Sequence, residues 1–276
     1  MLFRSVEMSE RKTMPTLETQ PSDKVIKMLV LGRSGVGKTG LLGSLAKDYR
    51  LFIADFDNGL DILRDPKIVD PAFRKNIYYK TYYDKASIIQ GKLIPSSAAF
   101  NQFVQDMGNW KEDNVSLGGI HSWKETDVFV IDSLTFLGNM IFNHVLQLAG
   151  RLGQKPQIQD FGNAMDAQET VIESLYNPAV QCNVLVLSHI QYQGDEANAS
   201  QQKGVASAIG KKLAPKIPRY FNNVVQVVKS GSGNNVKREI YTTATYDVDL
   251  KVSKPSKVPP IMEADLSKLF SLLKQG

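Results

Sequence analysis

The chain has 276 residues, of which 42% are hydrophobic and 22% are charged, and its formal net charge is +5. These values are typical of a globular protein that is long enough to bury a large core. The single cysteine, Cys182, excludes an intramolecular disulfide, and no spacing of Cys and His predicts a zinc site. No apolar run reaches the length of a membrane-spanning helix or a signal peptide, so we expect a soluble cytoplasmic protein with no membrane partner.

The excess of positive charge lies in the C-terminal part of the chain. Residues 1–199 carry 20 Lys and Arg against 23 Asp and Glu, whereas residues 200–276 carry 13 against 5. This asymmetry suggests contact with a polyanion, although a merely solvated basic surface is the commoner explanation.

The N-terminal part of the chain predicts a leader followed by a βαβ unit. Residues 1–23 show no periodicity and predict a flexible leader, in which Met8 and Met14 are alternative starts to Met1. A single domain is expected over residues 24–276. It opens with an apolar strand, KVIKMLVLG, which is followed by a glycine loop, a helix in KTGLLGSLAKDY and a second strand in LFIADFD.

The middle of the chain continues the alternation of strands and helices. The expected strands are residues 76–83, 127–133 and 182–189, because each is a short run rich in apolar or aromatic residues. A first helix is expected where residues 100–110 form an apolar face, and a second is expected from Leu134 to Leu148. A third is expected to follow a loop at 150–163 and to end near Tyr176. The sequence therefore predicts a doubly wound, mostly parallel sheet.

The C-terminal part predicts an antiparallel extension of that sheet. A polar loop is expected over residues 191–208, followed by a hairpin over about 224–252 whose second strand alternates from Ile240 to Val252. A short amphipathic helix is expected over about 263–274. Its apolar positions are Leu266, Leu269, Phe270 and Leu273.

The most specific motif is the glycine loop GRSGVGKT, which matches G-x-x-x-x-G-K-[ST] and lies between a strand and a helix. Such loops bind nucleotide phosphates through backbone N–H groups, here with Lys38 expected on the β- and γ-phosphates and the Thr39 hydroxyl on Mg²⁺. The cofactors expected are therefore ATP and Mg²⁺. The expected ATP-binding residues are Gly32, Arg33, Ser34, Gly35, Val36, Gly37, Lys38, Thr39 and Gly40.

Three acidic residues follow strands that are expected to end at the same edge of the sheet. Asp132 ends VFVID and is expected to face Mg²⁺ as the Walker B carboxylate. Asp55 and Asp57 both follow the second strand, and one of them would orient the attacking water. Alternation places both on one side of that strand, so spacing does not choose between them, and a turn-capping role is the alternative.

His189 ends the strand VLVLSH and is a further candidate for this edge of the sheet. There the His189 side chain would hydrogen-bond to the γ-phosphate. The loss of that phosphate would then change the conformation of the polar loop that follows. A histidine at a strand end is equally explained as a structural residue.

These motifs together resemble those of RecA-like ATPases over about residues 24–274, in particular compact AAA-type phage proteins for recombination and single-strand annealing. LFIADFDNGLD resembles the strand that carries the family's catalytic glutamate, which implies that role for Asp57, although this chain has Asp where the family has Glu. SHI resembles the family's Asn-Gln switch, with His189 in place of the glutamine. The implied catalytic residues are Asp57, Lys38 and His189, in a phage protein working inside a bacterial host.

The resemblance also implies partners. Residues 191–208, and also the loop at 150–163, are expected to contact single-stranded DNA, and a homo-oligomer, ring or filament, is expected to hydrolyse ATP between subunits. Another subunit or a single-strand-binding protein is a further candidate partner for the terminal helix, with packing against the chain's own sheet as the commoner alternative. A basic segment supplies candidates for DNA contact or for a finger that reaches a neighbouring subunit, with a solvated basic helix as the alternative: Lys203, Lys211, Lys212, Lys216 and Arg219.

The leading interpretation is thus an ATPase, stimulated by single-stranded DNA, that serves phage recombination, annealing or repair. A P-loop nucleotide kinase is an alternative in which residues 203–219 form a lid over phosphates. A second alternative is an assembly protein that ATP controls with little turnover. Four tyrosines, Tyr78, Tyr79, Tyr82 and Tyr83, fit either the surroundings of an adenine or, more commonly, a surface strand.

Overall fold

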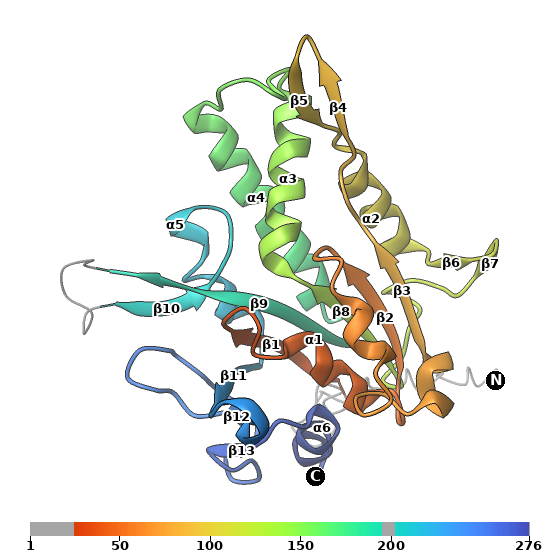
Figure 1. Ribbon diagram of the computed structural model, residues 1–276, viewed down its shortest axis with the longest axis vertical. Helices are drawn as coiled ribbons and strands as arrows, with labels where there is room; N and C mark the ends of the chain where they lie inside the picture. Colours follow the sequence, from red (N-terminus) through yellow and green to blue (C-terminus); the bar gives the residue numbers. More distant parts are fainter. Residues whose placement is uncertain (1–24, 195–201, 276) are drawn as a thin grey trace, which may run out of the picture.

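The computed structural model describes residues 25–194 and 202–275, so the expected leader at 1–23 lies outside the described residues (Figure 1). Its centre is a nine-stranded sheet in the order β13-β12-β11-β1-β9-β8-β2-β3, with β10 paired to β9. The parallel strands are β1 (Lys27–Gly32), β2 (Arg50–Asp55), β3 (Ile77–Thr81), β8 (Asp127–Asp132), β9 (Asn183–Gln193) and β11 (Asn223–Ser230). The antiparallel strands are β10 (Lys203–Ala206), β12 (Lys237–Tyr241) and β13 (Ile261–Glu263).

Apolar residues on alternate positions of the inner strands face two separate cores. One core lies under α2 (Ala98–Gly108), α3 (Leu134–Leu148) and α4 (Ile158–Tyr176). The other lies under α1 (Lys38–Leu41), the 3₁₀ turns η3 (Leu42–Leu45) and η4 (Leu60–Arg64), and α6 (Leu266–Lys274). Strands buried on both faces need apolar residues at every position, which is why β1, β8 and β9 read as continuous apolar runs. The predicted fold class, a mostly parallel sheet with an antiparallel C-terminal extension, is confirmed.

Smaller elements complete the described chain. Two short hairpins join β3 to α2 and α2 to β8, namely β4 (Ala86–Ile89) with β5 (Lys92–Pro95) and β6 (Lys111–Glu112) with β7 (Val115–Ser116). The remaining helical turns are η5 (Pro71–Asn76), α5 (Gly210–Leu213), η7 (Ile217–Tyr220) and η8 (Gly233–Asn235). None of the helices in the described chain is both long and apolar enough to cross a membrane.

Two predicted boundaries on the helical layers differ from the structure. The helix after the glycine loop has four residues and continues as a 3₁₀ turn, because Gly40 and Gly43 weaken the helix and Gly43 touches the chain at Ile68. The loop expected at 150–163 is shorter, because α4 begins at Ile158 with a capping box between Gln157 and Asp160.

The polar loop expected at 191–208 is largely a β-ribbon. β9 continues four residues beyond His189 and pairs with β10 in an antiparallel ladder, and the connection at 195–201 lies outside the described residues. Figure 1 shows this ribbon projecting beyond the body of the sheet. Polar residues such as Gln191, Gln193 and Lys203 interrupt the ribbon, so the apolar alternation that marks a strand is missing.

The second strand of the C-terminal hairpin is also shorter than expected. β12 ends at Tyr241, and the backbone N–H of Thr242 instead donates to the carbonyl of Pro260. The expected alternation therefore breaks, and the Tyr246 side chain is 76% exposed. The terminal helix is confirmed as α6, where the carboxylate of Asp265 caps the N–H of Lys268, and the four predicted apolar side chains are buried in this chain's own core.

Candidate nucleotide site

The glycine loop connects the end of β1 to the start of α1, as its motif requires. Gly37 has a φ of 99°, a left-handed conformation that favours glycine, and a Cβ there would lie 2.9 Å from the Nε of Arg238. A Cβ at Gly32 would lie 2.8 Å from the Val36 side chain. The loop is therefore packed too closely at Gly32 and Gly37 for larger residues, and glycines at such positions are what a phosphate-binding loop requires.

Lys38 closes this loop from inside. Its Nζ donates to the carbonyl oxygens of Gly32 at 3.0 Å and Arg33 at 3.1 Å. Burial lowers the pKa of Lys38 to about 8, and the negative charges of Asp132 and Asp57 oppose that shift. An anion in the loop would stabilise the charged ammonium, which the protein alone leaves poorly solvated.

Thr39 and Asp132 meet across the sheet edge. The Thr39 hydroxyl donates to Oδ2 of Asp132 at 2.7 Å, although the two residues come from different elements, α1 and the end of β8. Burial raises the pKa of Asp132 to about 7; the Thr39 hydrogen bond opposes the shift, and the charges of Asp57 and Asp55 add to it. A cation beside Asp132 would favour its charged form, which burial disfavours.

These residues fit Mg²⁺ carried by a nucleotide. The described residues contain no group of three or more His, Cys, Asp and Glu side chains that would hold a metal by themselves. Mg²⁺ in phosphate-transfer sites needs only one or two protein oxygens, because phosphates and water supply the rest. Thr39 and Asp132 would provide those two oxygens, and the ion would supply charge neutralisation for the phosphates.

The structure separates Asp55 from Asp57, which alternation had placed on the same side of one strand. β2 ends at Asp55, so Asp57 lies in the following turn, where Oδ1 accepts from the N–H of Ser133 at 3.1 Å and from its hydroxyl at 2.9 Å. Asp55 instead accepts from the N–H groups of Asp57 and Gly59 and from the Thr81 hydroxyl. Asp55 therefore holds the turn, whereas Asp57 faces the residue next to Asp132.

His189 lies on β9 directly beside the first glycine of the loop, paired in register with Gly32. Burial lowers the pKa of His189; the charge of Lys38 lowers it further, and that of Asp57 raises it. The backbone N–H of His189 donates to the Thr135 hydroxyl at 3.3 Å. The structure thus brings Lys38, Asp57 and His189 to one edge, while their roles stay predictions.

The remaining residues of the loop differ in exposure. Arg33, Ser34 and Gly35 are exposed, Val36 is buried, and Gly40 lies half-buried in α1 beside η4. The guanidinium of Arg33 lies 5.7 Å from the ring centre of Tyr192 on the β9–β10 ribbon. The ribbon and the phosphate loop are therefore in direct contact.

One residue of this site had no signal in the sequence. Arg238 lies on β12, 202 residues after Val36, and its Nε donates to the Val36 carbonyl at 3.1 Å. Only the order β12-β11-β1 brings these segments together, so neither spacing nor periodicity predicts the contact. Only a correct prediction of the strand register in the C-terminal hairpin would have indicated the contact between Arg238 and Val36.

The five basic candidates do not form one uniform segment. Lys203 lies on β10 and its Nζ donates to the Tyr246 carbonyl at 2.9 Å, whereas Lys211 and Lys212 are exposed on α5. Lys216 pairs with Glu169 of α4 at 3.4 Å, and Arg219 is exposed on η7. The remaining candidates for DNA contact are therefore Lys203, which lies in the ribbon, and Lys211 and Lys212, which follow it in the sequence.

Comparison with known proteins places this site in a family context. The model of a family described as AAA domain matches residues 24–252. No curated protein matches the chain.

Several solved structures resemble the chain at low sequence identity. The flagellar accessory protein FlaH from Methanocaldococcus jannaschii is 10% identical, with a TM-score of 0.42 and coverage of 86% of this chain and 83% of that one. A KaiC-like protein, PH0186 from Pyrococcus horikoshii OT3, is 10% identical, with a TM-score of 0.38 and coverage of 78% and 77%. An ATPase from the type III secretion system of pathogenic bacteria is 11% identical, with a TM-score of 0.40 and coverage of 75% and 55%. These likenesses are too distant to carry a functional argument.

The contact from Arg238 leads to a prediction about nucleotide binding. The Arg238→Ala variant is expected to bind an ATP analogue about tenfold more weakly, because the Val36 carbonyl loses its charged partner and the loop loses a support. Calorimetric titration measures this change. Lys229→Ala is the matched control, because Lys229 lies opposite Arg238 on β11. Equal affinities of the two variants would contradict the role of Arg238.

Proposed function

Because the chain belongs to the AAA domain family over residues 24–252, we propose that it binds and hydrolyses Mg-ATP and that single-stranded DNA stimulates this activity. The observation that carries the ATPase proposal is the 2.7 Å contact between Thr39 and Asp132, with Lys38 and Asp57 at the same sheet edge. Lys38 binds the transferred phosphate, and Asp57 orients the attacking water. His189 bonds to the same phosphate.

The β9–β10 ribbon supports the proposal of DNA binding. β9 runs without interruption from His189, beside the phosphate loop, to Gln193 in the projecting ribbon. Lys203 on β10 is exposed, and Tyr192 on β9 presents part of its ring. A cation and an aromatic ring on an exposed ribbon are the groups that bind phosphates and stack on bases. A shift of β9 at the nucleotide would move the DNA contacts directly.

The loop expected at 150–163 is a weaker candidate for DNA contact. It follows α3, which is about 22 Å long and begins at the nucleotide edge, so the loop lies at the remote end of that helix. Gly153 there packs near Ile94 of β5. We therefore assign DNA binding to the ribbon and to α5. The proposal that this activity serves recombination, annealing or repair of phage DNA rests on the motif resemblance alone.

The alternative of a nucleotide kinase has less support. It requires residues 203–219 to move as a lid, whereas this segment is tied to α4 through Lys216 and Glu169 at 3.4 Å, and through the Tyr220 hydroxyl, which donates to Glu169 at 2.7 Å. An assembly protein with little turnover is distinguished from an ATPase by the rate of phosphate release. We also propose that the chain forms a homo-oligomer, either a ring or a filament, and that it works with a single-strand-binding protein.

Removing two charges from α5 tests the DNA interface. The double variant Lys211→Gln and Lys212→Gln is expected to bind single-stranded DNA more weakly. The slope of its salt dependence should fall by roughly 1.4, because two fewer phosphate contacts mean that fewer counterions are released on binding. Fluorescence anisotropy across a salt series measures both quantities. The matched control replaces Lys47 and Lys268, which are exposed and lie on the α1 and α6 side of the sheet. An unchanged slope in the Lys211 and Lys212 variant would exclude α5 from the interface.

A further inference from the structure

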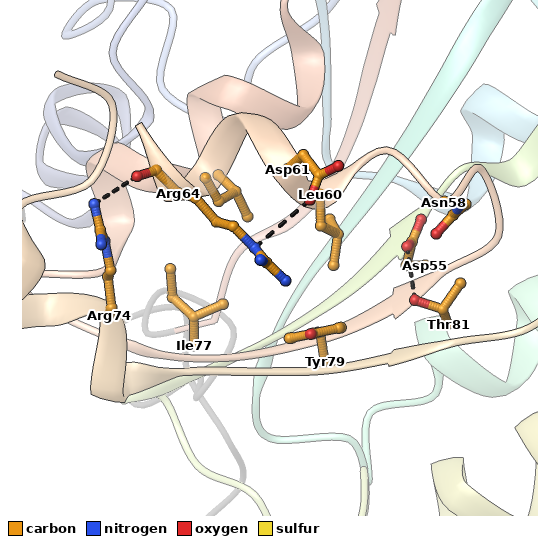
Figure 2. A pocket seen from close by; sticks show the side chains of 10 residues that line it. Asp55, Asn58, Leu60, Asp61, Arg64, Arg74, Ile77, Tyr79 and Thr81 are labelled. Carbon is orange, nitrogen blue, oxygen red and sulfur yellow. Dashed lines mark hydrogen bonds and ion pairs between the residues drawn. The ribbon is translucent and has the colours of Figure 1, made fainter. Parts of the chain in front are cut away.

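A cavity lies at the edge of the sheet, on the side of α1 but apart from the phosphate loop. It has a volume of about 240 Å³ and opens between β3 and the turn η4 (Figure 2). Alternate residues of β3, Ile77, Tyr79 and Thr81, form one wall, because residues two apart face the same side of a strand. The turns η4 and η5 supply Arg64 and Arg74, and no described residue of the phosphate loop lines the cavity.

One end of this cavity is cationic. Arg64 pairs only loosely with Asp61, at 3.6 Å, and the two side chains are 76% and 95% exposed. An exposed pair of this kind contributes little, so Arg64 is available to another anion. Nη2 of Arg74 donates to the Arg64 carbonyl at 2.6 Å, but its buried Nε has no hydrogen-bond partner among the described residues. Buried donors are normally satisfied, and the planar fork of a guanidinium group matches the geometry of a phosphate.

The middle and the other end of the cavity have different chemistry. Tyr79 lies in the middle and is 49% exposed, and Figure 2 shows Arg64 reaching from η4 toward the strand that carries this ring. Asn58, Asp55 and Thr81 lie together at the end away from Arg74 (Figure 2). An aromatic face between a cationic end and an amide and carboxylate end fits a base that carries a phosphate.

We propose that this cavity binds one nucleoside monophosphate unit. Its phosphate bonds to Arg64 and Arg74, its base stacks on Tyr79, and the polar edge of the base faces Asn58 and Asp55. The volume is below the 300 to 1,000 Å³ of sites for drug-sized ligands, so the cavity accommodates no more than one nucleotide. The unit is supplied either free or as one nucleotide of a single strand. This site is additional to the phosphate loop and does not depend on its function.

Calorimetry with the phosphate loop occupied tests the second site. The full chain is first saturated with Mg²⁺ and a non-hydrolysable ATP analogue, and each of the four deoxynucleoside monophosphates is then titrated. At least one is expected to bind at one further site. Arg64→Gln and Tyr79→Leu are each expected to weaken this binding at least about tenfold. Lys67→Gln and Tyr83→Leu are the matched controls, because both side chains are exposed and outside the cavity, and they are expected to leave the affinity unchanged.

The outcomes separate this site from the proposed ATPase. A chain that fails to bind the ATP analogue in the first step contradicts the proposed function, and the monophosphate titration still tests the cavity. If oligothymidylate displaces the bound monophosphate, the site exists and binds one nucleotide of a single strand. If it does not, the site exists and binds a free nucleotide. The proposal is overturned if none of the four monophosphates binds, if Arg64→Gln and Lys67→Gln weaken binding equally, or if an acidic peptide competes as well as the monophosphate.

Discussion

Replacing Lys38 with Ala is expected to lower the rate of ATP hydrolysis at least about a hundredfold. Its ammonium is buried in the phosphate loop, where it bonds to the Gly32 and Arg33 carbonyls. Charge that develops on the transferred phosphate then loses its preorganised partner, and such a loss costs about two to three orders of magnitude in rate. Steady-state release of phosphate measures the effect.

A thermal denaturation experiment controls for damage to the fold in the Lys38→Ala variant. Burial disfavours the charged form of Lys38 in the folded chain, so its removal is expected to leave the nucleotide-free melting temperature unchanged or higher. The rise in melting temperature that Mg-ATP causes is expected to disappear, because bound ligand is what stabilises the folded state. Lys47→Ala, an exposed change beyond η3, should behave as the wild type. A Lys38→Ala chain that hydrolyses ATP normally would remove the phosphate loop from the mechanism.

Replacing Asp57 with Asn is expected to preserve nucleotide binding while lowering turnover about a hundredfold to ten-thousandfold, the usual contribution of a general base. Oδ1 of its carboxylate accepts both bonds from Ser133, next to the Mg²⁺ candidate Asp132, and Asn retains an oxygen that can accept both. The geometry of the turn should therefore survive while the base is lost. Single-turnover kinetics with saturating ATP separates the chemical step from binding.

The neighbouring carboxylate provides the comparison for this variant. Asp55→Asn is expected to lower the melting temperature, because Asp55 accepts from the Asp57 and Gly59 N–H groups and from Thr81, but to change turnover less than about tenfold. If Asp55→Asn abolishes turnover at unchanged stability and Asp57→Asn does not, the assignment of the base is wrong.

Local sequence predicts two parts of this site. One is formed by a single continuous segment, and the other by residues at the ends of parallel strands. The glycine loop with Lys38 and Thr39 is one continuous motif between a strand and a helix. Asp132 follows an apolar run, and parallel strands end at the same edge, so its approach to Thr39 follows from the sheet alone. The contact of 2.7 Å between them is the geometric result of that arrangement.

The parts that sequence does not predict depend on where strands end and which strands pair. Asp55 and Asp57 are distinguished only because β2 stops at Asp55, a boundary that alternation does not reveal. The ribbon of β9 and β10 is held together by backbone pairing and contains polar residues at most positions of β9 beyond Ile190, so it lacks the apolar pattern of a strand. Arg238 reaches Val36 through strand order across 202 residues, and the cavity at Tyr79 exists only when η4 packs over β3. Tertiary packing decided each of these features.

The most direct test of the ATPase proposal is phosphate release by the wild-type chain with Mg-ATP, measured with and without single-stranded DNA at low salt. We expect hydrolysis that chelation of Mg²⁺ abolishes and that single-stranded DNA stimulates, with the stimulation declining as salt rises. A Mg²⁺-dependent rate that is the same with and without DNA would contradict the proposed link between the β9–β10 ribbon and the nucleotide site, and no hydrolysis under either condition would contradict the ATPase itself.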